Sequence, residues 1–161
     1  MRKNLEAVGL CALALLVFIT LRALYGPHRL AGRIPTHFGA NGRPDAWGPS
    51  AMLLVLPAVA VGLYILMTLV ARYPSVFNYP VRVTPQNRPR LEAAALAMIA
   101  WLKMELACLF AALQWFTIQV AGHPGRGLPP VLMPLALVAI FAAIAWHIAA
   151  MFRAGRMPPA P

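Results

Sequence analysis

The densest group of side chains that could do chemistry lies in residues 33–48, which read RIPTHFGANGRPDAWG. His37 can exchange a proton near neutral pH, Asp45 can accept hydrogen bonds, and Trp47 offers a large flat surface for binding. Imidazole and carboxylate groups can also bind zinc, and His28 lies in the same connection. These residues have no recognisable metal-ligand spacing, so we expect no metal or other cofactor and favour recognition of a ligand.

The composition of the chain indicates the class of protein to which residues 33–48 belong. Of the 161 residues, 61% are hydrophobic and only 11% are charged. A soluble domain is about half apolar and about a quarter charged. An apolar excess of this size cannot be buried in one core, so we expect an integral membrane protein in a lipid bilayer. The net charge is +10, but the basic residues form no stripe with interleaved aromatic residues, so we expect no nucleic-acid partner.

Four apolar runs are long enough to cross a bilayer, which takes about 20 residues in a helix. We predict spans at residues 5–24, 51–71, 92–121 and 129–152. The first run is longer than the core of a signal peptide, so we expect it to be retained as an anchor. The sequence therefore predicts an all-α integral membrane protein, a single domain built as a bundle of four transmembrane helices. The proline-rich residues 153–161 are expected to be a disordered tail.

The distribution of basic residues predicts which side of the membrane each connection faces. With both termini in the cytoplasm, eight basic residues lie inside and four lie outside. The inner set is Arg2, Lys3, Arg72, Arg82, Arg88, Arg90, Arg153 and Arg156, and the outer set is Arg29, Arg33, Arg43 and Arg126. This bias favours an N-in, C-in topology, which puts the connection 25–50 on the extracytoplasmic side.

Turn-forming residues predict that the 25–50 connection is folded. Pro35 and Pro44 fix the backbone φ angle, and Asn41-Gly42 is typical of a tight turn because both residues tolerate positive φ. We therefore expect a compact extracytoplasmic cap with Asn41-Gly42 at its tip.

The apolar residues beside this turn allow two interpretations. In one, the cap presents Trp47 and its neighbours to a ligand. In the other, Phe38 and Trp47 anchor the cap among lipid headgroups, and His37 only makes hydrogen bonds within it.

The segment Ile34-Pro35-Thr36-His37-Phe38, followed by Asn41-Gly42-Arg43-Pro44-Asp45-Ala46-Trp47-Gly48, resembles the signature of a small bacterial membrane module of unknown function. That module lies at the N terminus of SdpI-type toxin-immunity proteins and also occurs in many short membrane proteins. The resemblance covers roughly residues 5–72 and implies a multi-pass protein of the bacterial cytoplasmic (inner) membrane. The candidate binding residues in this loop are Pro35, Thr36, His37, Phe38, Asn41, Gly42, Asp45, Trp47 and Gly48.

A second group of candidate residues lies inside the predicted spans, where ionisable groups are costly and often functional. Lys103 and Glu105 are two residues apart, so they point to nearly opposite sides of one helix and cannot pair with each other. Gln114 shares the face of Lys103. A helix that is polar on two sides cannot face lipid on either, so we expect the span 92–121 to be central or to lie at an oligomer interface.

Two interpretations of these intramembrane residues stay open. In the structural one, Lys103 reaches towards the cytoplasm and Glu105 pairs with a neighbouring helix. In the functional one, Lys103 and Glu105 join His147, which titrates near neutral pH, in a relay that moves a proton or an ion.

The sequence carries no common catalytic signature. It contains no nucleophile elbow, no phosphate-binding loop and no HExxH motif. Cys11 and Cys108 both fall in predicted spans, where thiols behave as small apolar groups. We therefore do not expect an enzyme.

We expect a non-enzymatic recognition or immunity-type membrane protein that binds a peptide or protein ligand through its 25–50 connection. One alternative is a small transporter or ion relay working through Lys103, Glu105 and His147. Another is an accessory subunit of a larger membrane complex, or a homo-oligomer.

Overall fold

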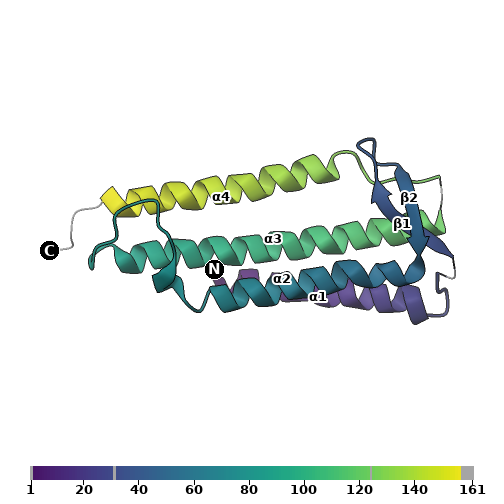
Figure 1. Ribbon diagram of the computed structural model, residues 1–161, viewed down its shortest axis with the longest axis horizontal. Helices are drawn as coiled ribbons and strands as arrows, with labels where there is room; N and C mark the ends of the chain where they lie inside the picture. Colours follow the sequence, from purple (N-terminus) through teal and green to yellow (C-terminus); the bar gives the residue numbers. More distant parts are fainter. Residues whose placement is uncertain (1, 31, 124, 157–161) are drawn as a thin grey trace.

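The computed structural model describes residues 2–30, 32–123 and 125–156. Four long helices run side by side along one axis (Figure 1): α1 (Arg2–Tyr25), α2 (Val55–Val70), α3 (Arg88–Gly122) and α4 (Leu132–Arg156). A short 3-10 helix, η1 (Ser50–Leu54), leads directly into α2. Within the described residues, four helical segments are long and apolar enough to cross a membrane. This confirms the expectation of a mainly helical, multi-pass membrane protein.

The structure corrects the all-α prediction in the 25–50 connection. Strands β1 (Arg33–Phe38) and β2 (Pro44–Pro49) pair in an antiparallel two-stranded sheet. The all-α expectation was wrong because a turn-rich segment with apolar flanks can close as a β-hairpin, and its two prolines hid the strands.

A second correction concerns the C-terminal end. Disorder was expected from residue 153, but α4 continues to Arg156. Met151 and Ala154 are buried against the start of α3, and this packing extends the helix. Residues 157–161 lie outside the described residues.

Helix α3 is the central element. It packs against α1 and α2 on one side and against α4 on the other, as Figure 1 shows. Between α1, α2 and α3 the core consists largely of small and aliphatic residues: Leu13, Leu16, Ala60, Ala107 and Ala111. Small side chains let helix backbones approach closely, which is how membrane helices gain packing contacts. The central position predicted for this helix is confirmed.

The outer face of α4 carries large apolar side chains that are more than half exposed. They include Leu135, Val138 and Phe141. In water such a face would be unstable, but against lipid it is the expected surface of a spanning helix.

Helix α3 has 35 residues, more than a bilayer requires. Its first turns, and the last turns of α4, extend past the N-terminal end of α1 (Figure 1). The connection 71–87 folds over this extension and packs Phe77, Tyr79 and Val81 against the buried Leu91. Burial, and then the nearby Glu92 carboxylate, raise the pKa of Tyr79, so its hydroxyl stays protonated and donates to the Pro74 carbonyl at 2.7 Å.

Candidate functional site

The hairpin is held by ladder pairs and a tight turn. Ile34 lies opposite Gly48 and Pro35 lies opposite Trp47, with register irregularities on both sides of His37. At the tip, the backbone N–H of Gly42 donates to the Gly39 carbonyl at 2.9 Å. Gly42 has φ +75°, the left-handed region that glycine tolerates best.

The tip of the hairpin docks on the connection between α3 and α4. The Leu128 N–H donates to the Gly42 carbonyl at 2.8 Å. A Cβ atom added to Gly42 would clash with the Leu128 carbonyl, and one added to Gly127 would come within 2.6 Å of the Gly42 carbonyl oxygen. Two glycines are therefore required for this close approach. No pattern in the sequence links these two segments, so sequence reasoning did not predict the contact.

This docking creates a pocket of about 740 Å³ between the two segments. The hairpin contributes Asn41, Arg43 and Trp47, and the α3–α4 connection contributes Arg126 and the residues around it. Both arginines are exposed and Trp47 is half-buried. The combination of two guanidinium groups and an indole suits a ligand with a carboxylate beside an apolar group.

Neighbouring groups orient these pocket residues. The Asn41 side-chain oxygen accepts the backbone N–H of Arg43 at 3.0 Å, which fixes the turn from which Arg43 projects. The Arg33 guanidinium donates to the Trp47 carbonyl and ties the base of one strand to the middle of the other. Hydrogen bonds between side chains and the hairpin backbone therefore hold the pocket wall in place.

The other loop residues lie outside this pocket. His37 Nδ1 is 2.6 Å from Asp45 Oδ1, and both side chains are more than half exposed, at 69% and 53%. Across the sheet, Gly48 leaves room for Thr36, whose Cγ2 would be 2.8 Å from an added Cβ. Among the described residues, no three His, Cys, Asp or Glu side chains are grouped so that they could hold a metal ion.

A second cavity of about 390 Å³ lies beneath the hairpin. Pro35, Thr36, His37 and Phe38 line it from above, and Gln114 lines it from α3. The candidate binding residues of the loop therefore do not form one site. Asn41 and Trp47 line the outer pocket, His37 and Asp45 form an exposed pair, and residues of β1 line this inner cavity.

Gln114 connects three elements deep in the structure. Its Nε2 donates to Thr20 Oγ1 at 2.8 Å on α1 and to the Leu53 carbonyl at 2.9 Å in η1. The side chain is fully buried, and its Oε1 has no hydrogen-bond partner among the described residues. Gln114 therefore positions the start of α2 and lies apart from the Lys103 cluster.

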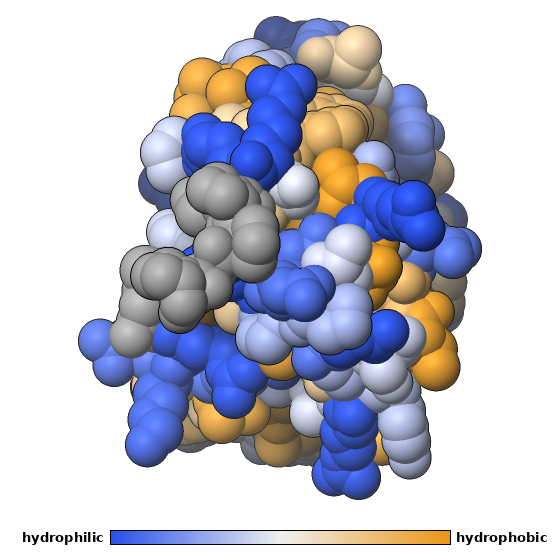
Figure 2. All heavy atoms as spheres, turned by 90° about the vertical axis from the view of Figure 1, so that its left-hand side faces the viewer, coloured by the Kyte–Doolittle hydropathy of each residue, from blue (hydrophilic) through white to orange (hydrophobic). Residues whose placement is uncertain are grey.

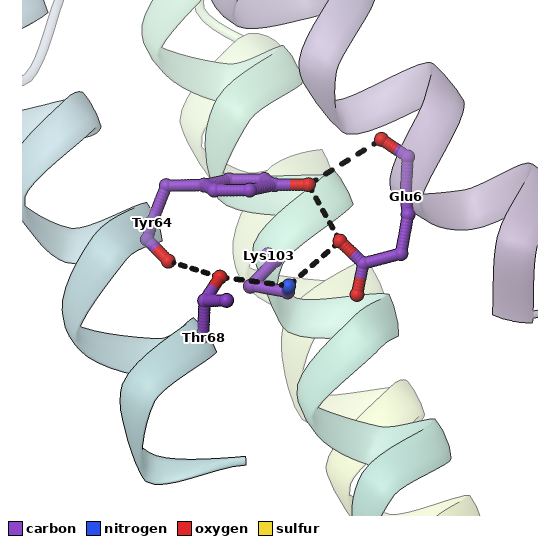
Figure 3. A network of polar contacts seen from close by, with 4 residues as sticks. All are labelled: Glu6, Tyr64, Thr68 and Lys103. Carbon is purple, nitrogen blue, oxygen red and sulfur yellow. Dashed lines mark hydrogen bonds and ion pairs between the residues drawn. The ribbon is translucent and has the colours of Figure 1, made fainter. Parts of the chain in front are cut away.

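Lys103 belongs to a polar network that joins α1, α2 and α3 (Figure 3). Its ammonium donates to Glu6 Oε2 at 2.7 Å and to Thr68 Oγ1 at 3.1 Å, and it lies 4.5 Å from the centre of the Tyr64 ring. Tyr64 also donates its hydroxyl to Glu6 Oε2 at 2.6 Å. The side chain of Lys103 is only 4% exposed, and its buried charge is paired with the Glu6 carboxylate.

Sequence reasoning missed Glu6, Tyr64 and Thr68. A signal for Glu6 was present, because the chain has only four acidic residues. Glu105 lies on the opposite face of α3, Glu92 is far along the same helix, and Asp45 is in the hairpin. Glu6 was therefore the carboxylate available to Lys103.

Glu105 and His147 lie on the other side of α3. They line a cavity of about 460 Å³ between α3 and α4, beside Trp101 and Trp146. His147 Nδ1 is 2.8 Å from the Ala143 carbonyl, while Glu105 Oε2 is buried with no hydrogen-bond partner in the described part of the chain. Glu105 of α3 and His147 of α4 thus share one cavity, and Lys103 is separated from these two members of the suggested relay.

Comparison with known proteins identifies similarity in the N-terminal part of the chain. A family model described as "Domain of unknown function (DUF1648)" matches residues 10–61, which include most of α1, the hairpin and the start of α2. An "Uncharacterized protein" of Archaeoglobus fulgidus is 42% identical over 86 residues, which cover 48% of this chain and 45% of that protein. No solved structure matches the chain.

The chain therefore spans less than half the length of this archaeal relative. Neither comparison links this chain to toxin-immunity proteins. Residues 10–61, the segment that places the hairpin between two spans, are similar to a domain of unknown function.

Proposed function

We propose that this chain is a non-enzymatic membrane protein that recognises an acidic peptide or protein segment at its hairpin end. The observation that carries the proposal is the pocket in which Arg43, Arg126 and Trp47 converge. Guanidinium groups bind carboxylates through paired hydrogen bonds, and an indole covers an adjacent apolar side chain at little cost in conformational entropy.

The charge of this end supports the choice of an acidic ligand. Arg43 and Arg126 carry positive charge into the pocket from the two connections that meet here, and Asp45 is the acidic residue of these connections. Asp45 contacts His37 and does not line the pocket, whereas both arginines do. Long-range attraction should therefore guide an acidic segment towards the pocket.

Orientation in the membrane completes the proposal. The bias of basic residues favours both termini in the cytoplasm, which places the hairpin on the outer face of the cytoplasmic membrane. The ligand would then be an extracytoplasmic peptide or the outer part of another membrane protein.

A photo-crosslinking experiment in intact membranes tests this function. A photoreactive residue at position 41, on the pocket wall, should crosslink to a protein or peptide with an acidic segment, identified by mass spectrometry. The same residue at position 46, on the exposed side of β2 away from the pocket, is the matched control.

The crosslink from position 41 should disappear in an Arg43→Gln/Arg126→Gln variant and persist in an Arg22→Gln/Arg29→Gln variant. A crosslinked product that is equally strong from position 46, or unchanged by loss of both pocket arginines, would contradict recognition in this pocket. A single product in stoichiometric yield would point to an accessory subunit of a stable complex.

A further inference from the structure

A separate cavity of about 460 Å³ lies where α1, α2 and α3 meet at the opposite end of the molecule. Three basic side chains line its mouth: Arg2 and Lys3 from α1, and Arg72 just after α2. All three are exposed, and none of them forms an ion pair among the described residues. Together with Lys103, these side chains give the cavity lining four basic groups against one carboxylate, Glu6, so the space is positively charged.

The inner wall of this cavity is apolar. Leu96 and Ile99 of α3 form it beside the first turns of α1, and Leu10 of α1 extends it towards the membrane interior. A free inorganic anion would satisfy the basic mouth but would leave this wall without a partner. An anion joined to a hydrocarbon chain would contact both parts.

The network around Lys103 keeps the cavity positive. Glu6 also lines the cavity, and its carboxylate could repel an anion. Lys103 and Tyr64 both donate hydrogen bonds to Oε2 of Glu6, at 2.7 Å and 2.6 Å. These two bonds hold the Glu6 carboxylate beside Lys103. The charge of Glu6 is thus matched by Lys103, and the charges at the mouth remain available.

The position of the mouth fits a membrane surface. Figure 2 views this end of the molecule, where hydrophilic side chains are spread across the surface with apolar ones between them. Under the N-in, C-in orientation this is the cytoplasmic side, where anionic lipids attract clusters of lysine and arginine.

We propose that this cavity binds one anionic phospholipid, with its phosphate at Arg2, Lys3 and Arg72 and an acyl chain along Leu10, Leu96 and Ile99. This site is independent of the hairpin pocket and of the function proposed for it. Its occupant would fix the N-terminal end of α1 against α2 and α3.

Native mass spectrometry of the purified full-length chain tests the site. Phosphatidylglycerol should remain bound at one molecule per chain under conditions that remove zwitterionic phosphatidylcholine. An Arg2→Gln/Lys3→Gln/Arg72→Gln variant should bind phosphatidylglycerol at least about tenfold more weakly. An Arg82→Gln/Arg153→Gln/Arg156→Gln variant, which loses the same charge at the same end outside the cavity, should bind as the parent does.

Two further experiments identify the source of the anion and the position of the acyl chain. Glycerol phosphate at the same concentration should not displace the lipid, because it has no acyl chain for the apolar wall. Phosphatidylglycerol with a photoreactive acyl chain should label peptides that contain residues 10, 96 or 99.

Displacement by glycerol phosphate would assign the site to a small anion and overturn the lipid proposal. Equal retention of phosphatidylcholine, equal losses in the two triple variants, or labelling spread evenly over all four helices would overturn it as well.

Discussion

At the scale of single residues, the clearest structural feature is the pairing of Lys103 with Glu6. A buried ammonium needs a carboxylate and further hydrogen bonds to offset the loss of water. Glu6 supplies the carboxylate, Thr68 accepts a hydrogen bond, and the Tyr64 ring lies beside the charge. Because these groups come from three helices, the network also fixes the relative positions of α1, α2 and α3.

We predict that Glu6→Gln destabilises the protein by about 2–4 kcal/mol, because it leaves the Lys103 charge buried and without its counter-charge. This loss of stability is somewhat smaller than the usual cost of breaking a buried ion pair, because the Glu6 side chain is 33% exposed. Equilibrium unfolding of the purified chain in mixed micelles would measure the change in the free energy of unfolding.

Two variants make this test specific. Glu6→Gln/Lys103→Met should be more stable than Glu6→Gln alone, since no unpaired charge remains. Glu92→Gln removes the partly exposed ion pair with Arg88, at 3.6 Å, and should cost less than about 1 kcal/mol. If Glu6→Gln and Glu92→Gln have the same small effect, the network does not stabilise the fold.

At the scale of elements, the close contact between the hairpin and the α3–α4 connection forms the outer pocket. The connection has two glycines that differ in their surroundings. A Cβ at Gly127 would press on the Gly42 carbonyl, whereas one at Gly125 would meet nothing within 4 Å. This difference provides a matched pair of variants in one short segment.

We predict that Gly127→Ala displaces the hairpin tip, weakens the Leu128–Gly42 hydrogen bond and costs about 1–3 kcal/mol locally. Hydrogen exchange at the Leu128 amide should then accelerate by tenfold or more. Gly125→Ala should leave the exchange rate nearly unchanged. Slow exchange at Leu128 in Gly127→Ala would show that the two segments do not depend on this contact.

The same elements show what could be predicted from sequence. Asn41-Gly42 was recognised as a turn because its residue types favour positive φ. The strands on both sides were not recognised, since Pro35 and Pro44 are unusual in strands and the pair is only six residues long on each side. The docking partner at Leu128 is about 86 positions away, and no local pattern encodes such a contact.

At the scale of the whole molecule, the lengths of the apolar runs were sufficient to predict the four long helices. A spanning helix must satisfy its backbone internally over a fixed thickness, so long apolar runs are reliable predictors. The central position of α3 also followed from its two polar faces. The predicted span 92–121 lies within α3, which begins slightly earlier, at Arg88, where the 71–87 connection packs against Leu91.

The separation of the intramembrane polar residues into two groups was also not predictable. Depth along each helix placed Lys103, Glu105 and His147 at similar levels, but rotation about α3 decides which of them meet. Lys103 faces α1 and α2, and Glu105 faces α4. This separation leaves no direct contact between Lys103 and the Glu105–His147 cavity.

The central claim is that the hairpin end binds an acidic segment from outside the cell. The most direct measurement is the binding of a fluorescent, glutamate-rich peptide with one apolar residue to membranes of known orientation. Spheroplasts expose the outer face, and inverted membrane vesicles expose the cytoplasmic face.

We expect saturable binding to spheroplasts that carry the protein, and no binding to inverted vesicles beyond the background of membranes without it. Arg43→Gln/Arg126→Gln should weaken this binding at least about tenfold, and Arg22→Gln/Arg29→Gln should change it less than about twofold. Binding only to inverted vesicles would contradict the proposed orientation, and binding that is unaffected by loss of both pocket arginines would contradict the proposed site.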